Sequence, residues 1–303
     1  MTTASTTAPA PTAPPRSGRP RRLAGALHRR PRIRLGLLLA GPIGWLGIIY
    51  LGSLALLLLN SFWSRDAFTG RIVHSFTLDN FTELTNNPYP IVTLRTFGLA
   101  AAVTVSCALL AFPIAYYMAR LASTRSRGLL VVAVLMPLWA SYLIKVYSWR
   151  LILAEDGVLN WALQPLGLKG PGYGLIALWL VFTYLWLPYM ILPIYAGLER
   201  IPNSLLEASA DLGGRAGTTF RRVILPLVFP AIVAGSIFTF SLTLGDYIAP
   251  AQITTTSVIG TVILANVGAG GNLPLAAAYS LVPLTIMIGY LLIARRLGAF
   301  EAL

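Results

Sequence analysis

The residues best placed to do chemistry form a polar island between two long apolar stretches, at residues 199–226. Ser204 and Glu207 stand three residues apart, which is the spacing of a capping box. In such a box the serine hydroxyl accepts from the amide of the glutamate, and the glutamate carboxylate accepts from the amide of the serine. The pattern predicts a helix of about two turns beginning at Ser204, with the carboxylates of Glu207 and Asp211 on its surface.

The same segment carries a stop signal and an apolar face. Gly213 and Gly214 suit the left-handed conformation that ends many helices. Leu205, Ala208 and Leu212 recur at helical spacing, so they share one face. Because a helix this short is not stable alone in water, we expect it to dock. Either it is a small helix packed within a loop of this chain, or it binds another protein.

A second group of polar and aromatic residues stands near the ends of other apolar stretches: Lys145, Tyr147, Trp149, Asp246 and Tyr247. A lysine there either extends its ammonium group to the membrane interface or faces an internal cavity. The aromatic residues form an interfacial belt or line a path. Asp246 is either solvated or meets a cationic substrate.

No catalytic pattern accompanies these residues. The chain contains no Gly-x-x-x-x-Gly-Lys-Ser/Thr phosphate loop, no nucleophile beside a base and no metal-ligand cluster. Cys107 is the one cysteine, so a disulfide framework is excluded. We expect no catalytic residue, no cofactor and no metal, and any ATP hydrolysis must occur in a separate chain.

Long apolar segments must position both groups. Of the 303 residues, 56% are hydrophobic and 11% are charged, which excludes an ordinary soluble domain. A membrane span needs about 20 apolar residues, and the segments that meet this need are 35–64, 96–119, 128–149, 170–198, 223–245 and 247–294. The last is too long for one crossing. A glycine-rich break at 266–274 divides it into an outer re-entrant or interfacial segment, 251–266, and a sixth span, 274–294.

The basic residues predict the orientation. Seventeen of the 23 lysines and arginines lie before the first span, between the second and third, in the polar island or after the sixth. The positive-inside rule places these segments, and therefore both termini, in the cytoplasm. Because the net charge of +13 is divided among these segments, it favours anionic membrane lipid over nucleic acid as a partner. Residues 1–34 are expected to be a disordered basic tail.

The polar island resembles the EAA loop of ABC-importer permeases, which reads Glu-Ala-Ala, three residues, Gly, nine residues, Ile-x-Leu-Pro. Glu207-Ala208-Ser209, Gly213 and Val223-x-Leu225-Pro226 match it in one register, with Ser209 and Val223 as departures. In that family the loop docks into a groove of a separate ATPase subunit. The resemblance therefore implies a coupling role for Ser204, Glu207, Ala208, Asp211, Gly213, Leu225 and Pro226.

Two further stretches resemble permeases of spermidine/putrescine-type importers. They are Pro137-x-Trp139 with Lys145-x-Tyr147-x-Trp149 and Gly157-x-x-Asn160, and Gly245-Asp246-Tyr247-x-x-Pro250. Arg is commoner in that family at the position of Lys145. The resemblance implies an all-α, polytopic protein of a bacterial inner (plasma) membrane, with six transmembrane helices in the type I ABC importer permease fold over residues 35–303.

The resemblance also implies partners and a substrate class. The partners are a cytoplasmic ABC ATPase dimer, a second permease subunit, expected to be a different chain, and an extracytoplasmic substrate-binding protein. The leading substrate hypothesis is a polyamine, while related permeases carry ferric iron, thiamine, phosphonates or opines. The rival class is a secondary transporter, which commonly shows inverted repeats and intramembrane ionisable residues. Apart from Lys145 the chain shows neither, and that class leaves the motif at 207–226 unexplained.

Overall fold

The computed structural model describes residues 31–66 and 68–298. The described chain forms two units, one ending at Leu57 and the other beginning at Leu58. In the described part, five helices are long and apolar enough to cross a membrane, and a bent pair of helices makes six if the pair is one broken span. The fold is therefore the expected all-α membrane architecture, with one short hairpin of β1 (Ser64–Arg65) and β2 (Ile72–Val73) as its exception.

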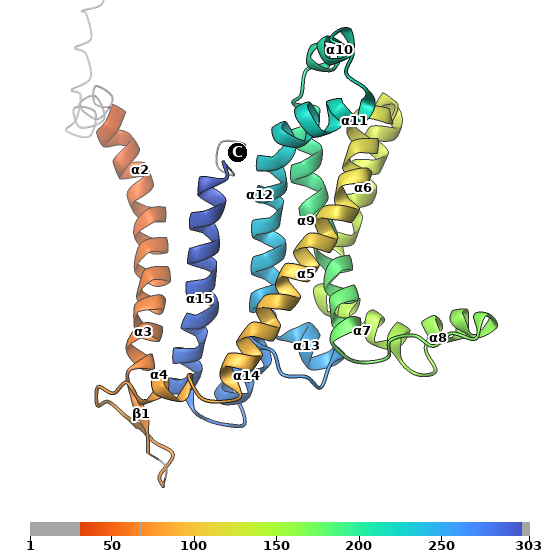
Figure 1. Cartoon of the computed structure of the whole chain (residues 1–303). Helices are drawn as coiled ribbons and strands as arrows, with labels where there is room; N and C mark the ends of the chain where they lie inside the picture. Colours follow the sequence, from red (N-terminus) through yellow and green to blue (C-terminus); the bar gives the residue numbers. More distant parts are fainter. Residues whose placement is uncertain (1–30, 67, 299–303) are drawn as a thin grey trace, which may run out of the picture. The chain divides into compact units, whose positions relative to one another are not determined.

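The first span runs through α2 (Pro31–Leu46), a π-helical turn η1 (Gly47–Leu51) and α3 (Gly52–Ser61). The predicted disordered tail lies outside the described residues as far as residue 30, and α2 begins four residues before its predicted end. The remaining helices, coloured from orange to blue in Figure 1, are α4 (Asp79–Glu83), α5 (Tyr89–Tyr116), η2 (Tyr117–Leu121), α6 (Thr124–Trp139), α7 (Tyr142–Leu153), α8 (Val158–Leu163), η3 (Gln164–Leu166), α9 (Leu175–Glu199), α10 (Asn203–Asp211), α11 (Ala216–Thr219), η4 (Phe220–Ile224), α12 (Leu225–Gly245), α13 (Ile248–Ile253), α14 (Ile259–Val267) and α15 (Leu273–Arg296).

Helix α9 is the centre of the second unit. It is the most buried of the spans, and it packs along both α5 and α12. Small residues allow this approach: a Cβ added to Gly197 would lie 2.6 Å from the Cβ of Ala231, and one added to Gly235 would lie 2.8 Å from the Sδ of Met190. Close approach through small residues is how helices associate where lipid replaces water.

Hydrogen bonds between side chains add to this packing. Trp179 Nε1 on α9 donates to Ser106 Oγ on α5 at 3.1 Å. Tyr290 OH on α15 donates to Ser236 Oγ on α12 at 2.7 Å. Each bond satisfies a polar group that would otherwise be unpaired in apolar surroundings. The two bonds therefore fix which face of α9 lies against α5 and which face of α15 lies against α12.

The third span differs from its prediction. The chain bends by 89° between α6 and α7, so a continuous span over 128–149 was wrong beyond Trp139. Residues 140–141 are extended, which ends the helical hydrogen bonding there. Lys145 Nζ donates to the carbonyl of Pro137 at 3.1 Å. The ammonium group thus satisfies a carbonyl at the end of α6, and a cation is favoured at a helix C-terminus.

The predicted break in the last apolar segment is confirmed. Helix α14 ends at Val267 and α15 begins at Leu273, with the Asn272 side chain accepting from the Leu275 amide at 3.3 Å. The sixth span therefore starts within one residue of its predicted position. The outer segment 251–266 falls within α13 and α14 and the turn that joins them.

The contact between α9 and α12 predicts the effect of one substitution. Gly197→Val should destabilise the protein by about 1–3 kcal/mol, because overpacking forces neighbouring side chains or backbone to move. Gly98→Val on α5 is the matched control, since nothing lies within 4 Å of a Cβ added there. Thermal unfolding in detergent should show a lower midpoint for Gly197→Val than for Gly98→Val. Equal midpoints would contradict this account of the packing.

Candidate functional site

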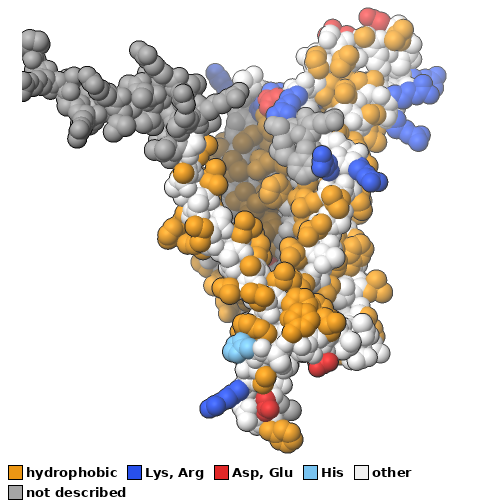
Figure 2. Space-filling model, turned by 90° about the vertical axis from the view of Figure 1, so that its left-hand side faces the viewer, with side chains coloured by type: hydrophobic (Ala, Val, Ile, Leu, Met, Phe, Trp, Pro, Cys, Tyr) orange, Lys and Arg blue, Asp and Glu red, His pale blue; other side chains and the backbone are white. Residues whose placement is uncertain are grey.

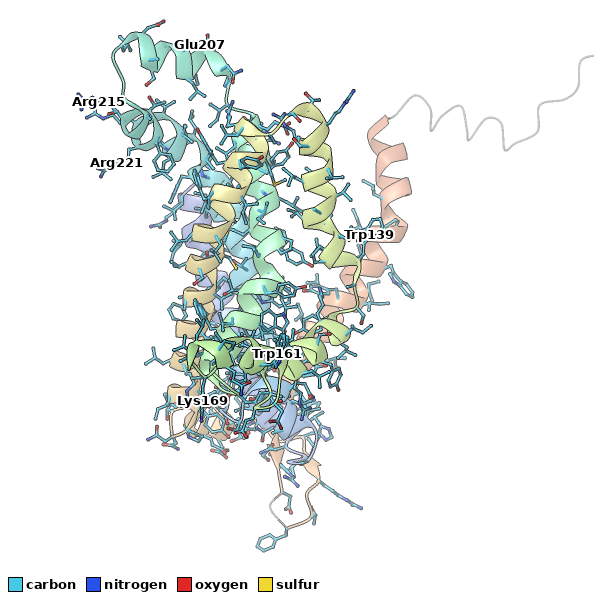
Figure 3. The ribbon with its side chains drawn as sticks, turned by 90° about the vertical axis from the view of Figure 1, so that its right-hand side faces the viewer. Trp139, Trp161, Lys169, Glu207, Arg215 and Arg221 are labelled. Atoms are coloured by element: carbon cyan, nitrogen blue, oxygen red, sulfur yellow. The ribbon has the colours of Figure 1, made fainter. Side chains whose placement is uncertain are left out.

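The polar island forms the end of the second unit at which α10 lies. Figure 3 places Glu207 on α10 with Arg215 and Arg221 beside it, while Trp161 and Lys169 lie toward the opposite end of the spans. Glu207, Ala208 and Asp211 are all exposed. Figure 2 shows acidic side chains at the tip of this end and Lys and Arg side chains gathered next to it. The helix is therefore presented outward with charges of both signs around it.

The predicted capping box is wrong. Helix α10 begins at Asn203 after Pro202, and no side chain caps its N-terminus. Ser204 is consequently the second residue inside the helix, two residues past the N-cap position that Pro202 occupies. Proline fixes the boundary because Pro202 is held in an extended conformation, with ψ at 142°. The Glu207 side chain makes no hydrogen bond or ion pair with any described residue, so its carboxylate is available to another molecule.

The predicted stop is confirmed. Gly213 has a φ of +76°, a conformation that favours glycine. Its amide donates to the carbonyl of Ala210 at 2.8 Å, and the Gly214 amide donates to that of Ser209 at 2.8 Å. These two bonds make a Schellman motif. A Cβ on Gly214 would lie 2.5 Å from the Ser209 carbonyl oxygen, so the chain needs both glycines to leave α10 at this angle.

Helix α10 is anchored by one leucine and exposes the others. Leu206 packs against the hydrophobic core of the spans. On the predicted apolar face, Leu205 is 43% exposed and Leu212 is 89% exposed, and Ala208 is exposed as well. This chain therefore leaves Ala208 and Leu212 uncovered, whereas Leu205 lies at the edge of a pocket that Pro193 and Leu227 also line. An exposed apolar stripe on a firmly held helix is a surface suited to docking against another protein.

The second half of the loop leads back into the membrane. The Ser209 and Thr219 hydroxyls are 2.8 Å apart and hydrogen-bonded, which ties α10 to α11. Phe220 packs edge-on against Phe112 of α5, with ring centroids 5.3 Å apart. Leu225 and Pro226 begin α12, where a proline costs no helical hydrogen bond. They set the start of the fifth span and are not part of the exposed helix.

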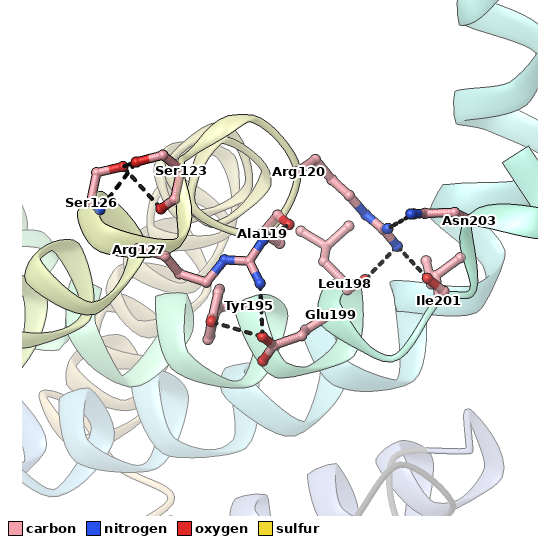
Figure 4. A network of polar contacts seen from close by, with 10 residues as sticks. All are labelled: Ala119, Arg120, Ser123, Ser126, Arg127, Tyr195, Leu198, Glu199, Ile201 and Asn203. Atoms are coloured by element: carbon pink, nitrogen blue, oxygen red, sulfur yellow. Dashed lines mark hydrogen bonds and ion pairs between the residues drawn. The ribbon is translucent and has the colours of Figure 1, made fainter.

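One residue that the sequence did not single out holds the base of the loop. Arg120 Nη2 donates to the carbonyls of Leu198 at 2.6 Å and Ile201 at 2.7 Å, and Nη1 donates to Asn203 Oδ1 at 2.9 Å (Figure 4). In the sequence Arg120 is one of many arginines near a span end. Nothing in its spacing separates a structural guanidinium from a charge that only orients the protein.

A second arginine serves the turn between α5 and α6. Arg127 Nη2 donates to the Ala119 carbonyl at 2.9 Å, and Nη1 pairs with Glu199 Oε1 at 3.2 Å. Tyr195 OH donates to the same carboxylate oxygen at 3.1 Å. The ion pair is partly exposed, so it contributes little stability by itself. Its geometry nevertheless fixes α6 against the end of α9.

The second predicted group lies around the bend between α6 and α7, and the structure brings only part of it together. Asp246 Oδ1 accepts from the amides of Ile248 at 2.7 Å and Ala249 at 3.2 Å, the first two residues of α13. Its Oδ2 accepts from Tyr142 OH. Lys145 is engaged with the Pro137 carbonyl instead. Asp246 therefore links α7 to the end of α12 through a tyrosine that the sequence suggested only as part of an aromatic belt.

The aromatic members of this group differ in exposure. Tyr147 is 48% exposed and Tyr247 is 45% exposed, whereas Trp149 packs against Tyr184 with ring centroids 5.4 Å apart. Behind Tyr142 stands Trp186 of α9, parallel to it within 8° at 6.0 Å. The bend is thus built from stacked rings around one carboxylate. Among the described residues, no three His, Cys, Asp or Glu side chains are grouped as metal ligands.

Comparisons with known proteins agree on one family. Residues 108–300 match the model of the binding-protein-dependent transport system inner membrane component family. The chain is 47% identical to the inner membrane ABC transporter permease protein YdcU of Escherichia coli K12, covering 93% of this chain and 95% of YdcU. It is 32% identical to the spermidine/putrescine transport system permease protein PotB of Haemophilus influenzae, covering 82% of this chain and 88% of PotB.

A solved structure shares the fold. A chain of a bacterial ABC transporter involved in the import of the acidic polysaccharide alginate superposes with a TM-score of 0.65 at 20% identity, covering 91% of this chain and 99% of that one. A second structure of an alginate ABC transporter, in complex with its alginate-bound periplasmic protein, gives a TM-score of 0.68 at 17% identity. With the helices and loop described above, these matches place the chain in the binding-protein-dependent transport system inner membrane component family, as a multi-pass inner-membrane permease of an ABC importer.

Proposed function

We propose that this permease couples ATP hydrolysis in a separate cytoplasmic ATPase dimer to the import of a polyamine, and that α10 is the element that docks into the ATPase. The observation that carries the proposal is the presentation of α10. Its start is set by Pro202 and its end by Gly213, while Leu205, Ala208 and Leu212 are exposed. An apolar stripe beside the free carboxylate of Glu207 is suited to a groove lined by apolar and basic groups.

The remaining partners follow from the same role. A permease chain of this size supplies half of a path, so it pairs with a second permease, which we take to be a different chain as in spermidine/putrescine systems. An extracytoplasmic binding protein delivers the substrate to the face opposite α10. Both termini lie in the cytoplasm on the evidence of the basic segments. Membrane lipid surrounds the spans, and we propose no nucleic-acid partner.

The coupling mechanism is mechanical. When ATP binding closes the ATPase dimer, α10 moves with the subunit to which it is docked. The Schellman turn at Gly213 and the hydrogen bond between Ser209 and Thr219 hold α10 to α11, so the displacement reaches η4 and α12 on one side. On the other side it reaches α9. Tilting these spans converts a cavity open to the cytoplasm into one open to the outside.

The substrate proposal rests on the relatives named for spermidine and putrescine and on the group at the bend. Tyr147 and Tyr247 are about half exposed, and aromatic ring faces attract ammonium groups by about 0.5–2 kcal/mol each. Asp246, next to Tyr247 in the chain, supplies a carboxylate, and Trp149 packs against Tyr184 at the bend. Lys145 cannot attract a cation. We assign it to holding the end of α6 through the Pro137 carbonyl, which keeps the path in shape.

Glu207→Gln tests the charge on α10. Because the structure shows no cap made by Glu207, both Glu207→Gln and Glu207→Ala should lower transport by about tenfold and leave the thermal midpoint unchanged. The measurement is substrate uptake by vesicles containing the whole complex, with the unfolding midpoint as control. Full transport by Glu207→Gln would exclude a charge-based contact with the ATPase.

Leu212→Asp tests the apolar stripe. The side chain is 89% exposed, so the variant should fold, yet it should lose at least about tenfold in ATPase affinity because a central apolar contact becomes charged. Leu297→Asp is the matched control, since that leucine is the C-cap that follows α15 and is 44% exposed. Retention of the ATPase during purification of the complex is the readout. If both variants retain the ATPase equally, α10 is not the docking element.

Asp246→Asn tests the substrate class. Removing the charge while keeping the shape should raise the KM for spermidine by about tenfold, the loss expected for one hydrogen bond to a charged group. Tyr142→Phe removes the bond to Asp246 but not its charge, and should leave the KM unchanged. Equal effects of the two variants would show that Asp246 acts only as a structural link. Absence of spermidine and putrescine uptake by the intact complex would overturn the polyamine assignment, and iron, thiamine and phosphonates would be tried next.

A further inference from the structure

Arg120 joins three segments that are not adjacent in the sequence. Its backbone belongs to η2, the π-helical turn that ends the second span. Its guanidinium group contacts the last turn of α9 through the Leu198 carbonyl and the turn that follows α9 through the Ile201 carbonyl. It also contacts the first residue of α10 through Asn203 Oδ1. Figure 4 shows the three contacts converging on one side chain. The second span therefore touches α10 directly, without passing through α11 or α12.

The acceptors explain why an arginine is needed. As the chain leaves α9, the Leu198 carbonyl accepts from the Ile201 amide at 3.3 Å, and Arg120 adds a shorter bond of 2.6 Å to the same carbonyl. A guanidinium group is planar and donates in a fixed fork, so it can hold several acceptors in one geometry. A lysine ammonium has no such fork. Arg120 Nε is itself buried and has no hydrogen-bond partner among the described residues, while the two outer nitrogens make three hydrogen bonds.

Arg127 provides the contrast. It lies seven residues further along the chain. It also connects η2 to the end of α9, through the Ala119 carbonyl and the Glu199 carboxylate. Its contacts stop there and do not include any residue of α10. The two arginines are alike in type, in location and in a buried Nε without a partner. They differ in whether they reach the exposed helix.

We infer that Arg120 is the joint that makes α10, the end of α9 and the end of the second span move as one body, so that displacement of α10 is passed to the second span. This inference rests on the proposed coupling role of α10. It adds a positioning residue outside the loop motif and a second route by which motion enters the membrane. If the joint is opened, α10 can still bind the ATPase, but part of its movement no longer reaches the spans.

The most direct test measures whether the joint is rigid. Spin labels at Leu121→Cys and Ala210→Cys report the separation of the second span from α10, and both positions are exposed. The single native cysteine, Cys107, is fully buried. In the complete complex, the distance between the labels should be the same without nucleotide and with ATP trapped. In Arg120→Met the distance should change between the two states. A constant distance in Arg120→Met would overturn the inference.

The functional test measures substrate imported per ATP hydrolysed, in vesicles containing the whole complex. Arg120→Met should lower this ratio by about tenfold, within the range of typical coupling between sites. Arg120→Lys should lower it too, since an ammonium group cannot replace the fork. Asn203→Ala removes only the contact with α10 and should lower the ratio while the α9 contacts remain. Arg127→Met should keep the ratio within about twofold.

Two results would contradict the joint. The first is an unchanged ratio in both Arg120→Met and Asn203→Ala. The second is a fall in transport that simply follows the amount of assembled complex, which would mean that Arg120 only stabilises the fold. A different result would reject the proposed docking role of α10. In that case the ATPase would remain bound to the Leu212→Asp variant. Asn203 is exposed, so Asn203→Ala should fold. If Arg120→Met does not fold, the ratio of import to hydrolysis in Asn203→Ala decides the question.

Discussion

The structure depends on one constraint, the absence of water inside the bilayer. Every backbone N–H and C=O group at that depth must be paired within the protein, so the spans are helices. Two irregular segments of the second unit concern the candidate sites, the polar loop around α10 and the bend between α6 and α7. At both, a basic side chain donates to carbonyls at or next to a helix end: Arg120 to Leu198 and Ile201, and Lys145 to Pro137. Both segments are therefore held in place by a basic side chain.

The packing of α9 explains how a movement at one end can reach the other. Gly197 and Gly235 let α9 and α12 approach closely, Gly197 against the Cβ of Ala231 and Gly235 against Met190. A stiff contact transmits displacement better than one lined by long flexible side chains. The stacked rings of Tyr142 and Trp186 continue the contact from α9 to α7. The proposed ATPase site and the proposed substrate path thus share one rigid helix.

Sequence patterns correctly predicted the features that depend on residues close together in the chain. The glycine stop at Gly213, the break before Leu273 and the register of the loop motif were readable because each depends on a few neighbouring residues. The bend after Trp139 was missed because the apolar run continues through it, and hydropathy does not register a change of direction. The capping box failed because the N-cap is Pro202, two residues before the predicted cap at Ser204.

The long-range contacts could not be predicted in this way. Arg120 meets its acceptors 78, 81 and 83 residues further along the chain, and Tyr142 meets Asp246 across 104 residues. Only the packed arrangement of the spans brings these groups together. An arginine, a tyrosine or an aspartate near a span end can have many roles, and only the positions of its neighbours in the fold show which role it has. The exposed part of the candidate site was therefore accessible from sequence, whereas the residues that hold it in place were not.

The measurement that tests the central claim most directly is uptake of labelled spermidine by vesicles containing the purified complex of this chain, its permease partner and its ATPase, with the binding protein supplied on the opposite side. The account predicts uptake only when ATP is present on the side where α10 lies, and none when the ATPase subunit is left out. Uptake that continues without the ATPase, driven by an ion gradient across the same vesicles, would contradict it.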